Sequence, residues 1–459
     1  MNTFTTPINI PVKGIRGPML TFRNDPFLSG QAEDCYDYCS DGLIVVGGDG
    51  KIVARGDYAS LRSEFPDLTD IDVYGQDSLI LPGFIDAHVH YVQSPMIASY
   101  GDTLVSWLGN YAFPTEIKFS DKAFADDVAR MFFRQILSHG TTTANVFSTT
   151  FATSVDAFFE ESERYGTRMI SGKVLQDRNL PELLRDKDAE SSVEISEALL
   201  RKWHGRGRQM YAVIPRFAPT STPDQLRLAG ELYQRYISDG VYMHTHLDEA
   251  ADEIRWALSL YPESSSYTDI YDRFGLVGRR SVFAHCCILR PEEWRTLHRN
   301  GCGVVTCPSS NLFLGDGEFK YWEAKNPEHP CRTGVGTDVG GGTSFSVVRQ
   351  LGEMYKVAML EGHAPDAIRS FYLATRGGAE ALHLENTVGA LDPGCEADIA
   401  VLDLESTEFM SWRMRFAETL AERLFILQTL APDNMCRATY SGGMKVYDRD
   451  KHDRFAYRV

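Results

Sequence analysis

The sequence predicts an α/β protein: a TIM-like (β/α)8 barrel with a small β domain formed by both ends of the chain. Three observations lead to this fold class. From Leu79 onward, about eight strand-like runs alternate with amphipathic helical stretches. The first 79 residues and those after residue 392 have β character without a helical period. Histidines and a carboxylate recur at the ends of the predicted barrel strands, where barrels carry their chemistry.

The chain is expected to divide into three segments that form two domains. Residues 1–79 would supply the N-terminal part of a small β-sandwich domain, and residues 80–392 the barrel. Residues 393–459 would complete the small domain and add one amphipathic helix over Met410–Thr429. A length of 459 residues exceeds a single compact domain of roughly 150 residues, so a barrel with a smaller domain fits it.

The sequence predicts strands in three regions: near the N-terminus, in the barrel and after the barrel. Near the N-terminus, Gly42–Val46 and Lys51–Ala54 flank the turn sequence Gly47-Gly48-Asp49-Gly50, which indicates a β-hairpin. The barrel strands are expected at Leu79–His90, Thr141–Phe147, Arg168–Leu175, Met210–Phe217, Val241–His246, Ser281–His285, Gly303–Cys307 and Thr333–Asp338. After the barrel, Ala397–Asp403 and Gly443–Tyr447 return to strand character.

Helix start and stop signals separate these strands. A long amphipathic stretch begins after Ser120 and stops at His139-Gly140. A second helix is closed by Gly166, and a third opens with Pro223 at its first helical position. Further helical patterns cover Glu194–Trp203 and Pro291–Arg299. The alternation is that of a parallel barrel with helices outside.

The composition narrows the class of partner. With a formal net charge of −17 and a pI near 5.2, the surface would repel phosphate backbones, so we expect a small neutral substrate and no nucleic acid. The nine cysteines are scattered, which is typical of reduced thiols. We expect no membrane partner and a cytoplasmic location, because no apolar run could span a bilayer and the N-terminus lacks an apolar signal region.

The sequence Asp86-Ala87-His88-Val89-His90, at the end of the first barrel strand, indicates half of a metal site. Residues two apart on a strand point to the same face, so His88 and His90 project together. Later barrel strands end in His246, His285 and Asp338. Imidazoles with one carboxylate suit Zn²⁺, with Fe²⁺ as an alternative.

Two carboxylates follow the fifth predicted barrel strand. Glu249 and Asp248 lie three and two residues after His246, and spacing alone does not decide which is the acid–base group. His244, two residues before His246, would lie one layer deeper on the same face, as a packing residue or as a support for a ligand.

Arg216 ends a buried strand, where a charge must be paired or must bind something. Both a structural ion pair and a substrate contact stay open for it. Trp107 and Phe113 could cover the site or belong to the core. The cysteines near the strand ends are expected to be small buried hydrophobic residues and not ligands: Cys286, Cys287, Cys302 and Cys307.

Several motifs together resemble those of the amidohydrolase superfamily, in its mononuclear deaminase branch. The motifs shared across the superfamily are PGFIDAHVH, HTHLDE, FAHC and GVGTDVGGG. Other stretches are similar to the guanine deaminases within that branch: Gln93 in HYVQ, Leu104–Glu116, Arg216-Phe217 in IPRF, Thr268–Asp272, Cys307–Leu312 and Thr337–Ser346. The resemblance runs from about Leu79 to Asp403 and is weaker at both ends.

The resemblance implies a role for each of these residues. One zinc ion per chain would be held by His88, His90, His246 and Asp338. Catalysis would rest on Glu249, Asp338 and His285, and substrate contacts on Gln93, Trp107, Arg216, Phe217, His246 and Glu249. Two-metal branches carry a modified lysine at the end of the fourth strand. Because that strand ends in Arg216 here, the resemblance implies a single ion.

The reaction implied by the resemblance is the hydrolytic deamination of guanine to xanthine and ammonia, in purine catabolism and salvage. Asp338 would take a proton from the zinc-activated water, and Glu249 would protonate ring N3. His285 would stabilise the oxygen that adds to C2. Arg216 would face O6 of the purine, and Gln93 its ring nitrogens.

Two other hypotheses stay open. One is a sister hydrolase acting on another heterocycle, such as an s-triazine, a pterin or an oxidised purine. The other is a non-catalytic barrel used as a scaffold, which is disfavoured because such relatives lose metal ligands that are all present here. A homodimer is expected from the resemblance, and the predicted helix at Met410–Thr429 could pack on the barrel or form a dimer contact.

Overall fold

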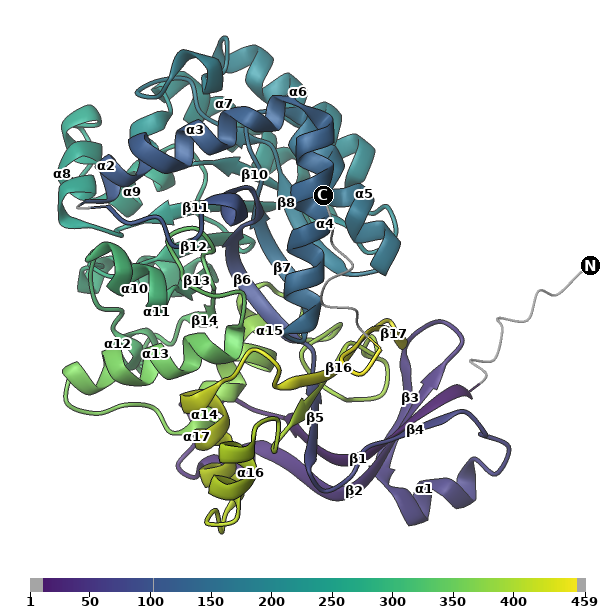
Figure 1. Cartoon of the computed structure of the whole chain (residues 1–459). Helices are drawn as coiled ribbons and strands as arrows, with labels where there is room; N and C mark the ends of the chain where they lie inside the picture. The colour runs from purple at the N-terminus through teal and green to yellow at the C-terminus, as the bar shows by residue number, and fades with distance from the viewer. Residues whose placement is uncertain (1–10, 102, 452–459) are drawn as a thin grey trace, which may run out of the picture.

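The chain folds into a parallel barrel that stands on a smaller sheet (Figure 1). The computed structural model describes residues 11–101 and 103–451. The barrel strands follow one another as β6 (Phe84–His90), β7 (Thr141–Phe147), β8 (Arg168–Gly172), β10 (Met210–Pro215), β11 (Tyr242–Leu247), β12 (Ser281–His285), β13 (Gly303–Thr306) and β14 (Arg332–Val335). A short extra strand, β9 (Val174–Leu175), pairs with β10. The predicted (β/α)8 barrel is confirmed.

The barrel strands are apolar because both of their faces are covered. Every residue of β6, β7 and β12 is buried, as parallel strands between a packed interior and an outer layer of helices require. The residues that fill the lower barrel interior include Ile85, Ala87, Phe147, Ile170, Ala212 and Ile214. This packed interior forms the floor under the polar strand ends.

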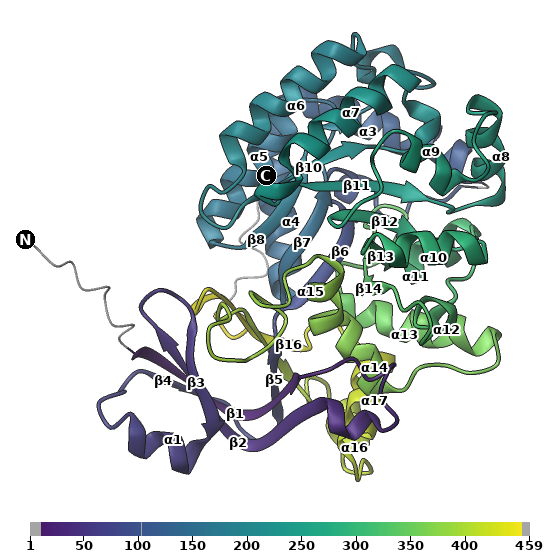
Figure 2. The same ribbon diagram turned by 180° about the vertical axis from the view of Figure 1, so that it is seen from behind.

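Helices surround the barrel on the outside (Figures 1 and 2). They are α4 (Lys122–Ser138), α5 (Ala152–Tyr165), α6 (Ala189–Trp203), α7 (Pro223–Tyr236), α8 (Ala251–Leu260), α9 (Tyr267–Arg273), α10 (Pro291–Arg299), α11 (Pro308–Leu314), α12 (Tyr321–Ala324), α13 (Val347–Leu360), α14 (Ala367–Tyr372) and α15 (Gly378–Ala381). Asp121, one residue after the predicted Ser120, caps α4. Gly166 ends α5 in the left-handed conformation, and Pro223 opens α7.

The barrel closes between its first and last strands. β14 and β6 form no regular ladder in the described chain, and single hydrogen bonds join them instead. The Asp338 amide N–H donates to the His88 carbonyl over 2.9 Å. The Asp86 carboxylate accepts from both the amide and the hydroxyl of Thr337, the amide bond measuring 2.9 Å. The seam therefore lies where the predicted metal ligands of the two strands meet.

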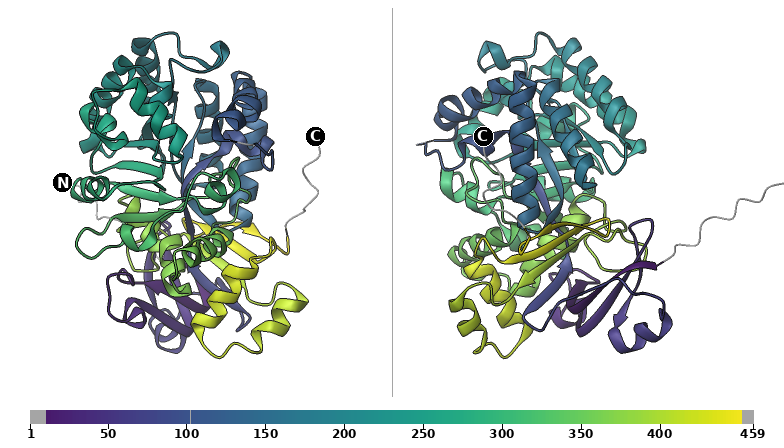
Figure 3. Two further views of the ribbon diagram at one scale, coloured as in Figure 1. Left: turned by 90° about the vertical axis from the view of Figure 1, so that its left-hand side faces the viewer. Right: turned by 45° about the vertical axis from the view of Figure 1, so that its right-hand side comes forward.

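The smaller sheet joins the two ends of the chain (Figure 3). Its pairing path is β17 (Met444–Asp448), β16 (Cys436–Ser441), β15 (Ile399–Asp403), β5 (Ser78–Pro82), β1 (Pro11–Phe22), β2 (Tyr36–Gly47) and β3 (Ile52–Asp57), with β4 (Ile71–Val73) beside β1. The predicted hairpin is β2–β3, with Val45 opposite Ala54. A short helix, α1 (Tyr58–Glu64), covers one face.

The chain passes from the small sheet to the barrel at Gly83, between β5 and β6. A Cβ at this position would lie 2.2 Å from Thr142 Oγ1, so the tight crossing requires glycine. The boundaries placed at residues 79 and 392 stay a prediction. No helix in the two described ranges is long and apolar enough to cross a membrane.

The predicted single helix over Met410–Thr429 is wrong. Two helices occupy this region, α16 (Glu408–Met414) and α17 (Leu420–Leu430). Each has its own threonine cap, and Thr419 forms a capping box with Glu422 that starts a new helix. This Thr-x-x-Glu signal was present in the sequence.

Two arginines of the barrel hold the small sheet through buried carboxylates. Arg168 and Arg208 both pair with Glu396, and Arg208 also pairs with Asp398 over 2.6 Å. Although burial opposes ionisation, the hydrogen bond from Arg168 and the charge of Arg208 keep the pKa of Glu396 below its usual value. The network connects the first residue of β8 and a residue just before β10 with the segment that enters β15.

Replacing Glu396 with glutamine is expected to lower the free energy of unfolding by about 2–3 kcal/mol, because two partly buried guanidinium groups lose their counter-charge. Urea unfolding measures the change. The control is Glu163→Gln, which breaks a more exposed pair with Arg206 and should cost less than about 1 kcal/mol. Equal losses in the two variants would contradict this role for the network.

Candidate active site

The predicted metal-binding residues meet at the carboxyl end of the barrel. His88 and His90 end β6, His246 lies near the end of β11, His285 ends β12, and Asp338 follows β14. All five side chains are buried. Within the described residues, two overlapping groups have donor atoms close enough for one ion: His88, His246 and His285, and His88, His90 and Asp338.

The donor atoms converge on a small volume. Asp338 Oδ1 lies 3.2 Å from His88 Nε2 and 3.4 Å from His90 Nε2. The Nε2 atoms of His90 and His246 are 3.0 Å apart. His88 Nε2 is buried and has no hydrogen-bond partner in the described structure. Burial lowers the pKa of His88, His90 and His246, so these imidazoles are neutral and offer lone pairs. A neutral nitrogen set with one carboxylate fits a divalent metal ion.

Two of the imidazoles are oriented through their second nitrogen. His88 Nδ1 forms a 2.8 Å hydrogen bond with Nε2 of His244, and His246 Nδ1 donates to the Arg216 carbonyl over 2.7 Å. Such bonds fix the ring and the tautomer of a ligand. The sequence left His244 open between packing and support, and the structure gives it a hydrogen bond to His88.

Two residues of the site, neither of them glycine, have a left-handed backbone conformation at or just after the end of a strand. His285 has φ of 71° and Asp338 has φ of 47°, a region that costs L residues conformational energy. These turns point both side chains back toward the cluster. His285 Nδ1 is held 2.8 Å from Asn311 Oδ1, which leaves its Nε2 facing Asp338 Oδ2 at 3.9 Å.

The two candidate acid–base carboxylates point in different directions. Glu249 lines the cavity beside the cluster, with Oε1 3.5 Å from His285 Nδ1, whereas Asp248 does not line it. Burial, reinforced by the charges of Glu253 and Asp338, raises the pKa of Glu249. Burial and the neighbouring Glu249 also raise the pKa of Asp316, to about 10. Glu249 is thus placed to hold a proton at neutral pH.

The predicted substrate contacts line the same cavity. Its walls are His90, Gln93, Leu104, Trp107, Leu108, Arg216, Phe217, His246, Glu249, His285, Leu314 and Asp338. Trp107 belongs to α2 (Leu104–Trp107), and its indole N–H donates to the Ser99 carbonyl over 2.8 Å. Phe113 does not line the cavity; it lies against Arg216, whose guanidinium carbon is 5.4 Å from the ring centre. The predicted aromatic cover therefore includes Trp107 but not Phe113.

Arg216 combines the two roles that the sequence left open. It lines the cavity, and its Nη1 donates to both oxygens of Glu116, over 2.8 and 3.0 Å. Glu116 ends the short helix α3 (Phe113–Glu116) and is fully buried. Glu116 lies within the Leu104–Glu116 stretch, and nothing in the sequence assigns it a role. A buried carboxylate beside a buried arginine can be expected, but their pairing across 100 positions cannot be identified from one sequence.

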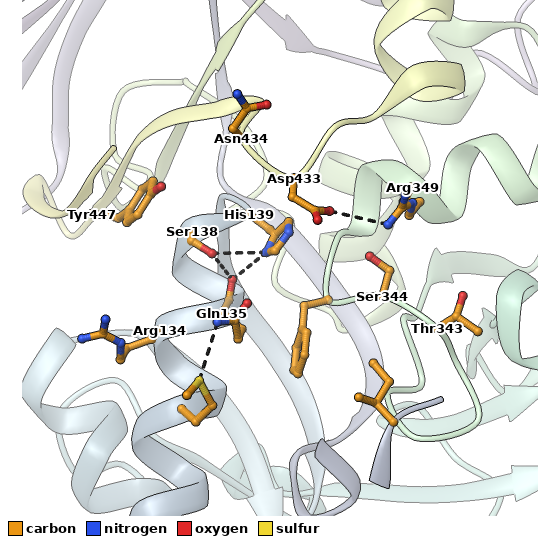
Figure 4. A pocket seen from close by; sticks show the side chains of 13 residues that line it. Arg134, Gln135, Ser138, His139, Thr343, Ser344, Arg349, Asp433, Asn434 and Tyr447 are labelled. Atoms are coloured by element: carbon orange, nitrogen blue, oxygen red, sulfur yellow. Dashed lines mark hydrogen bonds and ion pairs between the residues drawn. The ribbon is translucent and has the colours of Figure 1, made fainter. Parts of the chain in front are cut away.

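A larger cavity lies elsewhere, between α4, the loop before α13 and the small domain (Figure 4). It encloses about 500 Å³ and shares no residue with the cavity beside the histidines. Arg349 pairs with Asp433 across it at 3.5 Å, and His139 binds the Gln135 carbonyl at 2.8 Å. Size alone therefore does not identify the chemical site.

The profile of the Amidohydrolase family matches residues 79–446. The chain belongs to the amidohydrolase family. This confirms the resemblance drawn from the motifs, and the match spans the barrel together with strands of the small domain.

Guanine deaminases are among its relatives. Guanine deaminase of Escherichia coli is 40% identical over 96% of this chain and 98% of its own length. A solved structure of the E. coli guanine deaminase superposes with a TM-score of 0.92, at 39% identity, over 95% of this chain and 100% of that one. The guanine deaminase of C. acetobutylicum, solved with bound guanine in the active site, has a TM-score of 0.83 at 25% identity and covers 95% and 100% of the two chains.

Replacing His244 with phenylalanine is expected to weaken the binding of a divalent metal by about 10–100-fold, because His88 loses the bond that orients it. Competition with a chelator of known affinity measures the change. His139→Phe, at a partly buried histidine outside the site, is the control. Unchanged affinity in the His244 variant would show that His244 is only a packing residue.

Proposed function

We propose that this amidohydrolase converts guanine and water to xanthine and ammonia with one zinc ion per chain. One observation carries the proposal: residues suited to bind a metal ion and residues suited to bind a purine line the same cavity. His90, His246 and Asp338 of the cluster line this cavity, and so do Arg216 and Gln93. The similarity to guanine deaminases over nearly the whole chain supports the same substrate.

The proposed zinc ligands are His88, His90, His246 and Asp338. Their neutral imidazoles, their converging Nε2 atoms and the unpartnered His88 Nε2 support this assignment. Bound zinc would lower the pKa of water to about 7 and so supply the nucleophile at neutral pH. Fe²⁺ is the alternative ion for the same donors.

The remaining chemistry falls to side chains around the cavity. Asp338 would accept the proton of the attacking water at a carboxylate oxygen. Glu249, whose pKa is raised by burial, would deliver a proton to ring N3 and make C2 electrophilic. His285, with Nε2 facing Asp338, would orient the water and the oxygen that adds to C2. Asp338 would pass the water proton to the amino group, which would leave C2 as ammonia, and the C2 hydroxyl would return a proton to Glu249 as it becomes the carbonyl of xanthine.

The purine would be held by the edge that carries O6 and by its two faces. Arg216 would donate to O6, and Gln93 would bind a ring nitrogen. Phe217 and Trp107 are buried walls of the cavity and would enclose the ring. The residues that line the cavity are all buried, and such low-dielectric surroundings would strengthen each of these contacts.

The broader setting follows from the reaction. Consuming guanine places the enzyme in purine catabolism and salvage. We also expect a homodimer in the cytoplasm. Gel filtration with light scattering tests the homodimer, because a mass of one chain, 51.5 kDa, would refute it.

Guanine supplied to the zinc-loaded protein is expected to yield stoichiometric xanthine and ammonia. Ultraviolet absorbance and an ammonia assay follow the reaction. Removing the metal with a chelator should abolish turnover, and restoring zinc should recover it. No turnover of guanine with zinc bound would overturn the substrate assignment. A screen of s-triazines, pterins and oxidised purines would then test the alternative of a sister hydrolase.

Replacing Glu249 with glutamine is expected to lower kcat for guanine by about 10²–10⁴-fold, because the amide cannot deliver the proton. Steady-state kinetics and metal analysis of the same sample measure it. The matched control is Asp248→Asn, one residue away, in a left-handed conformation that asparagine tolerates. A larger loss in the Asp248 variant would assign the acid to Asp248 instead.

A further inference from the structure

Glu116 touches both residues that face the purine edge but does not line the cavity itself. Arg216 Nη1 donates to both of its oxygens, and Gln93 Nε2 donates to Oε1 over 3.0 Å. All three side chains are nearly or fully buried. One carboxylate therefore determines how two substrate-facing groups are presented.

The contact decides which end of the Gln93 amide faces the cavity. A carboxylate paired with an arginine only accepts hydrogen bonds, so the amide must direct its NH₂ group at Glu116. Its oxygen is left as the group available to a ligand. Gly340 lies against this oxygen: a Cβ there would sit 2.3 Å from Gln93 Oε1. Glu116 on one side and the Gly340 backbone on the other hold the amide in one orientation.

Arg216 offers hydrogen-bond donors, which complement the acceptor offered by Gln93. Its Nη1 is used by Glu116, and the ring of Phe113 lies 5.4 Å from its guanidinium carbon. A guanidinium only donates hydrogen bonds, and its remaining N–H groups are available on the cavity side. The cavity thus presents a fixed donor and a fixed acceptor along one edge.

We propose that Glu116 is a positioning residue that makes the cavity selective for a carbonyl oxygen beside a ring N–H. Guanine has this arrangement at C6 and N1. 2,6-Diaminopurine has the reverse, an amino group beside an unprotonated nitrogen, and the same amino group at C2. The inference rests on the proposed function and names the feature of the substrate that the site recognises.

The test compares guanine with 2,6-diaminopurine in the zinc-loaded wild type and the Glu116→Gln variant. The wild type should prefer guanine in kcat/KM by at least about 10³-fold, because buried groups built for one pattern stay unpaired with the other. In the variant the new amide can donate a hydrogen bond to Gln93, so the Gln93 amide can flip and exchange the positions of its oxygen and NH₂ group. The preference should fall by at least about tenfold, and kcat/KM for guanine by about 100-fold.

The matched control is Asp186→Asn, which removes the carboxylate from another buried ion pair, with Lys173. This pair does not line the cavity, so stability should fall while the ratio between the two purines stays unchanged. A proportional loss for both purines in Glu116→Gln would overturn the proposal, because a merely structural residue would act in this way. Guanine left unused by the wild type would instead refute the proposed function, and the inference with it.

A second variant covers the case in which Glu116→Gln does not fold. Glu116→Asp keeps the charge for Arg216 but is one methylene shorter, so it loses reach to Gln93. The preference for guanine should again fall by at least about tenfold, with a smaller change in thermal stability. An unchanged preference in a folded Glu116→Asp protein would overturn the proposal.

Discussion

The seam between β6 and β14 is the constraint on which the site depends. Barrel closure brings residues 250 positions apart into contact, through the Asp338–His88 backbone bond and the Asp86–Thr337 pair. Without that seam, Asp338 would not lie beside His88 and His90. The left-handed backbone of Asp338 then turns its carboxylate into the barrel mouth, at a conformational cost that the packed strands sustain.

Burial sets the protonation states that the chemistry needs. The same low-dielectric surroundings lower the pKa of the imidazoles and raise the pKa of Glu249, which are the directions that the proposed metal ligands and the proposed acid require. Arg216 connects the two halves of the site. Its backbone carbonyl accepts a hydrogen bond from His246, and its side chain pairs with Glu116 beside the cavity. A substitution of Arg216 would remove the side-chain pairing with Glu116 but keep the backbone carbonyl that His246 uses.

The sequence predicted the barrel because its signals are local. Strand ends, helix caps and the HxH spacing can all be identified within about a dozen residues, and the structure places those elements where they were expected. The helix pair α16–α17 was missed because apolar periodicity was weighed above the capping box at Thr419. The roles of Glu116, Asn311 and Asp86 could not be predicted, because each is defined by a partner on another element.

We propose that one metal ion and the purine share a single cavity, in which the hydrogen-bond donor of Arg216 and the acceptor of Gln93 are fixed. Crystals grown with zinc and an unreactive guanine analogue, measured at the zinc absorption edge, test it directly. We expect one anomalous peak among His88, His90, His246 and Asp338, with the C6 oxygen of the analogue at Arg216 and its N1–H at the Gln93 oxygen. Two metal ions, no metal ion, or an analogue whose carbonyl edge points away from Arg216 would contradict it.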